Sequence, residues 1–131
     1  MDNEINTLGR LSETEMEVML EIWQMDPPIT VSRLLKIFNE RREWKISTMS
    51  TILDRLIEKG YLTKKIEGKA NIYMPTLTDN EYKSYETRMF IEKVHHGSLK
   101  SFVAALAGYE KMDKEDVDKM RSWFLKKAGE L

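Results

Sequence analysis

Short hydroxyl side chains crowd one face of the stretch STMSTILDRLIEK, residues 47–59. Met49, Ile52, Leu53 and Leu56 recur there at helical spacing, which predicts a helix that packs against a core along these residues. A solvated helix face ordinarily favours Glu, Lys and Gln, because Ser and Thr are weaker helix formers. Hydroxyls are short enough to let a helix enter the major groove of DNA, where they donate or accept hydrogen bonds. The face with this chemistry carries Ser47, Thr48, Ser50, Thr51, Asp54 and Arg55.

Basic residues concentrate around the same helix. Residues 30–75 hold ten Lys or Arg and five Asp or Glu, whereas residues 1–29 hold one basic and seven acidic residues. The whole chain has a net charge of −1, so the average hides this asymmetry. A local excess of positive charge is typical of a surface that meets phosphates. The side chains expected to contact the DNA backbone are Arg55, Lys59, Lys64, Lys65 and Lys69.

Three predicted helices hold this face in place. The first begins with the capping-box pair Ser12 and Glu15 and ends before the prolines at 27 and 28. Thr30 caps the second helix, and Gly60 ends the third. The apolar positions expected to face the core are Met16, Met19, Leu20 and Trp23 in the first helix and Val31, Leu34, Leu35 and Phe38 in the second.

A β-hairpin is predicted after the third helix. Apolar and polar residues alternate from Leu62 to Ile66 and again from Ile72 to Met74, around the turn Glu67-Gly68-Lys69. Three short helices followed by a hairpin describe a winged helix-turn-helix, whose third helix lies in the major groove. The predicted class is mainly α with a small β-hairpin, and residues 1–77 are predicted to be the DNA-binding domain.

Residues 78–131 are predicted to form a helical dimerisation domain. Thr78 with Glu81 and, later, Asp113 mark helix starts, and Gly97 marks a helix end. Three short helices bury little apolar surface on their own, so a second copy of the chain is expected to cover it. The residues expected at this dimer interface are Phe90, Leu99, Phe102, Val103, Leu106 and Phe124.

The remaining composition argues against other classes of protein. The chain has no cysteine, so it offers no disulfide or thiolate metal site, and a cytoplasmic location fits. No apolar run approaches the roughly 18 residues of a membrane span, so membrane insertion is not expected. The two histidines, His95 and His96, are adjacent, which disfavours shared ligation of a metal on a helix. We expect no enzyme activity, no cofactor and no metal.

Four stretches resemble the successive signatures of the penicillinase-repressor family of bacterial transcription factors, the BlaI/MecI type with its copper-responsive CopY branch. They are LSETEMEVMLEIW, TMSTILDRLIEKGYL, EGKANIYMP and HGSLKSFVAALA, in the family's order. The resemblance implies a homodimeric winged-helix repressor that binds a palindromic operator in double-stranded DNA. It implies a recognition helix at Ser47–Lys59, a basic wing residue at Lys69 and the family's tyrosine at Tyr73.

The resemblance leaves the release from DNA open. Family members that govern β-lactam resistance are cleaved after a membrane sensor-protease is triggered, at an Asn–Phe bond that aligns with Ala105–Leu106 here. That departure, and the absence of the cysteines of the copper branch, leave the inducing signal undefined. Two alternatives stay open: a winged-helix regulator released by a small ligand, and a winged helix that binds protein and no DNA.

Overall fold

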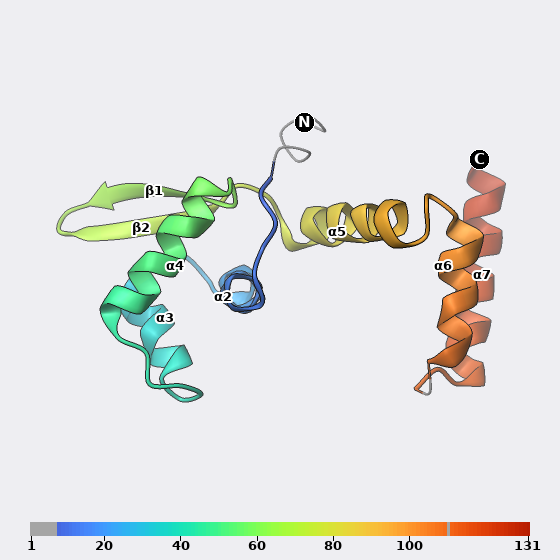
Figure 1. Cartoon of the computed structure of the whole chain (residues 1–131), viewed down its shortest axis with the longest axis horizontal. Helices are drawn as coiled ribbons and strands as arrows, with labels where there is room; N and C mark the ends of the chain where they lie inside the picture. Colours follow the sequence, from blue (N-terminus) through green and yellow to red (C-terminus); the bar gives the residue numbers. More distant parts are fainter. Residues whose placement is uncertain (1–7, 110) are drawn as a thin grey trace. The chain divides into compact units, whose positions relative to one another are not determined.

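The computed structural model describes residues 8–109 and 111–131, which form two compact units that meet between Thr87 and Arg88. This boundary falls inside helix α5, which runs from Asp79 to Val94. The predicted class, mainly helical with one β-hairpin, is confirmed (Figure 1). The first unit contains α2 (Glu13–Gln24), α3 (Val31–Phe38), α4 (Ile46–Glu58), β1 (Leu62–Glu67) and β2 (Ala70–Pro75), and the second contains α6 (Leu99–Ala105), a 3-10 turn (Leu106–Gly108) and α7 (Lys114–Glu130).

The helix starts predicted from capping residues are confirmed. The Ser12 hydroxyl accepts from the Glu15 amide while the Glu15 carboxylate accepts from the Ser12 amide, so α2 opens with a complete capping box. Thr78 and Glu81 make the same reciprocal pair ahead of α5. Gly60 follows α4 with a φ of +93°, the left-handed conformation that glycine adopts freely.

The core of the first unit lies between α2, α3, α4 and the base of the hairpin. The apolar face of α2 is centred on Val18, Met19 and Ile22, whereas Leu20 is 44% exposed, so its predicted place in the core was wrong. Trp44 stacks on Phe38 with ring centroids 4.9 Å apart, which ties the loop before α4 to the core. The other fully buried side chains include Leu34, Met49, Leu53, Leu56, Tyr61 and Leu62.

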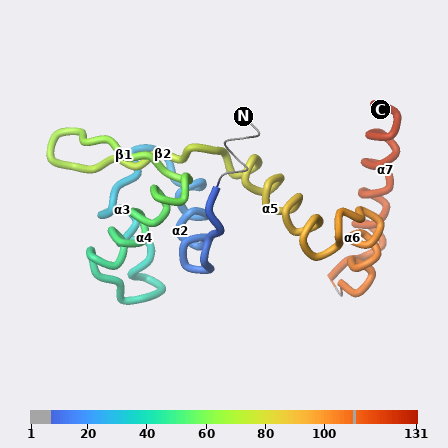
Figure 2. Tube along the Cα trace, turned by 45° about the horizontal axis from the view of Figure 1, so that its top comes forward, coloured from blue at the N-terminus to red at the C-terminus, as the bar shows by residue number. Residues whose placement is uncertain are grey.

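The hairpin has the predicted wing geometry. Strands β1 and β2 pair antiparallel from Leu62↔Pro75 to Glu67↔Ala70, and the turn consists of Gly68 and Lys69. Gly68 has a φ of +66°, the positive value that tight hairpin turns require. The Tyr73 amide donates to the Ile29 carbonyl at 3.0 Å, which fastens the base of the wing to the start of α3. The tip extends away from α2, α3 and α4 (Figure 1 and Figure 2).

The second unit, residues 88–131, is the smaller of the two. None of its described residues is buried, although Phe90, His95 and Phe102 pack their rings against one another. The chain turns after α5 through two residues with positive φ, His96 at 52° and Gly97 at 79°. The stretch after Ser98 forms α6 and the 3-10 turn. No helix of the described chain is both long and apolar enough to cross a membrane.

Candidate nucleic-acid interface

Helix α4 turns its apolar stripe into the core and leaves the opposite face exposed. Ser47, Thr51, Asp54 and Glu58 follow one another at intervals of four, three and four residues, so they form the row farthest from the core. Thr48 and Arg55 lie on one flank of this row and are exposed, whereas Ser50 on the other flank is half-buried. The hydroxyl-bearing face inferred from the sequence therefore points to solvent, with two acidic residues in its central row.

A shallow groove runs between α4 and the start of α2. The groove brings together the predicted DNA contacts Thr48, Thr51 and Arg55. Thr51 Oγ1 donates to the Ser47 carbonyl at 2.8 Å, so its remaining capacity toward a ligand is to accept a hydrogen bond and to offer its methyl group. Besides these residues, the groove is lined by Ser12, Thr14, Glu15, Ser47 and Ile52.

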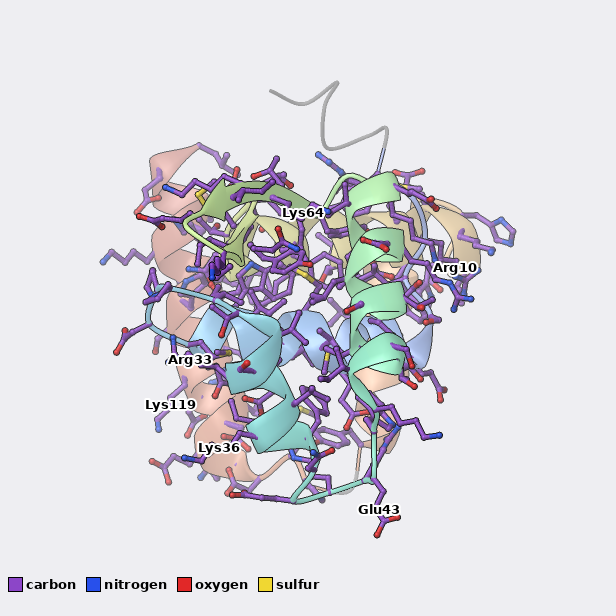
Figure 3. All side chains as sticks on the ribbon, turned by 90° about the vertical axis from the view of Figure 1, so that its left-hand side faces the viewer. Arg10, Arg33, Lys36, Glu43, Lys64 and Lys119 are labelled. Carbon is purple, nitrogen blue, oxygen red and sulfur yellow. The ribbon has the colours of Figure 1, made fainter. Side chains whose placement is uncertain are left out.

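A second groove runs between α4 and the hairpin. Lys64 lines it together with Asp54 and Glu58 of α4, and Figure 3 shows Lys64 beside that helix. Lys65 is the next residue in β1, so its side chain leaves the opposite face of the strand and does not share this groove. Lys69 is exposed in the turn at the tip of the wing.

Lys59 is engaged inside the first unit. Its ammonium lies 2.5 Å from the Glu15 carboxylate and donates to the Arg10 carbonyl at 2.7 Å. Burial alone would raise the pKa of the Glu15 carboxyl, but hydrogen bonds from Lys59 and Ser12 outweigh burial and leave that pKa below its ordinary value. The Gly9 amide also donates to the Lys59 carbonyl at 3.0 Å. The sequence suggested a phosphate contact for Lys59, whereas this geometry shows it joining the end of α4 to the start of α2.

Helix α2 also pairs with two cations of the loop before α4. Arg42 lies 2.8 Å from Glu17, and Arg41 lies 2.5 Å from Glu21. Part of the positive excess counted in the sequence is therefore neutralised within the first unit. The basic residues of segment 30–75 that form no ion pair with any described residue are Arg33, Lys36, Lys45, Arg55, Lys64, Lys65 and Lys69.

Three of these cations were not singled out in the sequence, and one of them, Arg33 on α3, donates to the Asp26 and Pro28 carbonyls. Lys36 lies on α3, and Lys45 is the residue from which α4 starts, without a side-chain cap. Figure 3 shows Arg33 and Lys36 on α3 to one side of α4, and Arg10 on the other side of that helix. The excess of basic residues in segment 30–75 was the signal that could have pointed to Arg33, Lys36 and Lys45.

The apolar residues predicted for dimerisation are largely uncovered. Phe90, Leu99, Val103 and Phe124 are 51%, 59%, 44% and 47% exposed, while Phe102 and Leu106 are half-buried. His95 Nδ1 lies 2.8 Å from Ser101 Oγ, so this ring has a local partner. No three His, Cys, Asp or Glu side chains within residues 8–109 and 111–131 gather closely enough to hold a metal.

An exposed third helix, a basic wing beside it and flanking cations that form no ion pair with any described residue define a winged helix-turn-helix of the DNA-binding kind. Residues 11–125 match the family model described as penicillinase repressor, and the chain belongs to that family. Membership confirms the resemblance seen in the four sequence stretches. The family is one of non-enzymatic regulators, so the prediction that the chain is not an enzyme is also confirmed.

Several known proteins are similar to this chain over most of its length. The penicillinase repressor of Bacillus licheniformis is 27% identical over 86% of this chain and 88% of the relative. The methicillin resistance regulatory protein MecI of Mammaliicoccus sciuri is 27% identical over 93% of this chain and 98% of the relative. Among solved structures, the DNA-binding domain of the repressor BlaI is 32% identical, with a TM-score of 0.48, over 56% of this chain and 88% of that one. Monomeric Bacillus licheniformis BlaI in complex with the blaP half-operator is 32% identical, with a TM-score of 0.49, over 57% and 90%.

Proposed function

We propose that this chain is a transcriptional repressor that binds a palindromic operator as a homodimer. The observation that carries the proposal is the exposed face of α4, where Thr48, Thr51 and Arg55 share one groove. Hydroxyls and a guanidinium at this spacing suit base edges and neighbouring phosphates in a major groove. Lys64 beside α4 and Lys69 at the wing tip supply charge for the flanking backbone.

The dimer is supported by the state of residues 88–131. A unit in which no described residue is buried, and in which several large apolar side chains are about half exposed, lacks a core of its own. A second copy of the same unit would cover these side chains through a two-fold interface. Two recognition helices would then lie about one DNA turn apart, roughly 34 Å, which makes the operator palindromic. On this proposal residues 1–77 bind DNA and residues 78–131 dimerise.

Relief of repression is assigned to proteolysis or to another signal not yet identified, with a membrane sensor-protease as the candidate partner. The bond that aligns with the family's cleavage site joins Ala105, the exposed last residue of α6, to Leu106 in the 3-10 turn. Helix α6 has only seven residues, and so short a helix opens readily because isolated helices of this length are marginal in water. Local opening would present this bond to a protease.

Selection of bound duplexes from a random DNA pool, at two salt concentrations, tests the proposal. The expected result is an enriched two-fold sequence whose binding weakens steeply with salt, together with a dimer in sedimentation. Weak binding with no enriched sequence would overturn it in favour of protein recognition. Loss of the enriched sequence when a small-molecule fraction is added, with the protein uncleaved, would favour the alternative of a regulator released by a small ligand.

A further inference from the structure

Two carboxylates lie in the outermost row of the candidate recognition helix. Asp54 and Glu58 are both exposed, one helical turn apart, and neither forms an ion pair with any residue that the structure describes. A surface that only needed to hold DNA would not place negative charge there, because carboxylates repel phosphates and lose water on docking. Their presence therefore calls for a compensating contact in the bound state.

Asp54 is the better placed of the two for a base contact. It follows Thr51 by three residues in the central row, near the middle of α4, whereas Glu58 is the last residue of that helix. Arg55 is its neighbour in sequence but lines the groove on the α2 side, while Asp54 lines the groove on the hairpin side. Burial raises the pKa of Tyr73 and the charge of Asp54 adds to the rise, which is consistent with a carboxylate near the base of the wing.

We infer that Asp54 is a specificity-determining residue that accepts a hydrogen bond from the exocyclic amine of a cytosine in each half of the operator; the inference rests on the proposed function. Cytosine N4 is the donor that Asp and Glu prefer in the major groove. Guanine and thymine present O6 and O4 acceptors at the corresponding place, and these repel a carboxylate. Asp54 thus favours one base and penalises others, which a hydroxyl cannot do because it adapts to donors and acceptors alike.

The test repeats the pool selection with three variants of the full chain. Asp54→Asn keeps the shape and removes the charge, Asp54→Ala removes the group, and Glu58→Gln removes the neighbouring charge as a matched control. We expect the wild type to select cytosine at one position per half-site. Asp54→Ala should lose at least roughly tenfold of that preference, and Asp54→Asn should shift it toward adenine, whose N6 and N7 suit an amide.

Binding to random duplexes separates base reading from general charge. Both Asp54→Asn and Glu58→Gln should bind random DNA more tightly by similar factors, because each removes one repulsive charge per subunit. Only the Asp54 variants should alter the selected sequence. An unchanged selected sequence with Asp54→Ala would overturn the inference and leave the proposed function intact. A wild type that enriches no sequence would overturn the proposed function and, with it, the inference.

Discussion

Replacing Lys59 by methionine should destabilise the first unit although Lys59 lies at the end of the helix proposed to face DNA. Its partner Glu15 is 3% exposed, whereas the Lys59 side chain is 31% exposed. Removing one partner of a fully buried ion pair costs about 3–5 kcal/mol, because the other charge stays buried. Since water reaches the lysine here, we expect Lys59→Met to lower the free energy of unfolding by about 2–3 kcal/mol.

Urea unfolding, followed by tryptophan fluorescence at one protein concentration, measures this loss. Glu15→Gln retains an acceptor for the Ser12 amide, so it provides a neutral partner for a double-mutant cycle. The double variant should lose less than Lys59→Met alone, because it buries no charge. A loss under about 1 kcal/mol for Lys59→Met, or simple additivity in the cycle, would refute the account of this ion pair.

The same ion pair predicts how the free energy of unfolding depends on pH. The pKa of Glu15 is lowered below 4.5 in the folded chain, so its stabilising contribution is fully present above 4.5 and is lost as the pH falls through the folded pKa. Without Lys59, only the hydrogen bonds from Ser12 oppose burial, so the protonated carboxyl is more favoured than in the wild type. The difference in free energy of unfolding between the wild type and Lys59→Met should therefore become smaller as the pH falls below 4.5. A deficit that is constant with pH would contradict this.

Three further changes probe the wing, the dimer and the turn after α5. Lys69→Ala should weaken binding to all duplexes alike and reduce the salt slope by about 0.9 per subunit, as measured by titrations at several salt concentrations; altered base preference would argue against a phosphate contact. Leu99→Glu, at a side chain 59% exposed, should give monomers in sedimentation with unchanged helix content; an intact dimer would exclude α6 from the interface. His96→Gly should raise the free energy of unfolding by about 0.5–1 kcal/mol, because glycine accepts the φ of +52° without strain. Thermal melts would show a loss of stability instead if the imidazole supports the turn after α5.

Most of the first unit could be predicted from sequence because its signals are local. The Ser12–Glu15 and Thr78–Glu81 boxes each join residues only three positions apart, and the turn at Gly68 needs only its own backbone freedom. The core-facing side of α4 could also be predicted, because its apolar residues follow the helical period. The place of Leu20 in the core was misread, because α2 turns a slightly different face inward, toward partners that its own pattern does not reveal.

The roles of individual charges could not be predicted in the same way. Lys59 and Glu15 are 44 positions apart, and Arg42 and Glu17 are 25 apart. Only the folded chain shows that these residues neutralise each other, so a count of basic residues overstates what remains for DNA. Lys64 and Lys65 look equivalent in the sequence, yet the pleat of β1 sends them to opposite faces.

The two carboxylates in the outermost row of α4, Asp54 and Glu58, affect how long the protein stays bound at non-specific sites on a chromosome. A bacterial genome offers on the order of a million competing sites, and time spent on them delays arrival at the right one. At a site that presents no amine to Asp54, an unpaired carboxylate against the groove should shorten each residence. Faster dissociation of this kind lowers the affinity for arbitrary DNA and shortens the search for the operator.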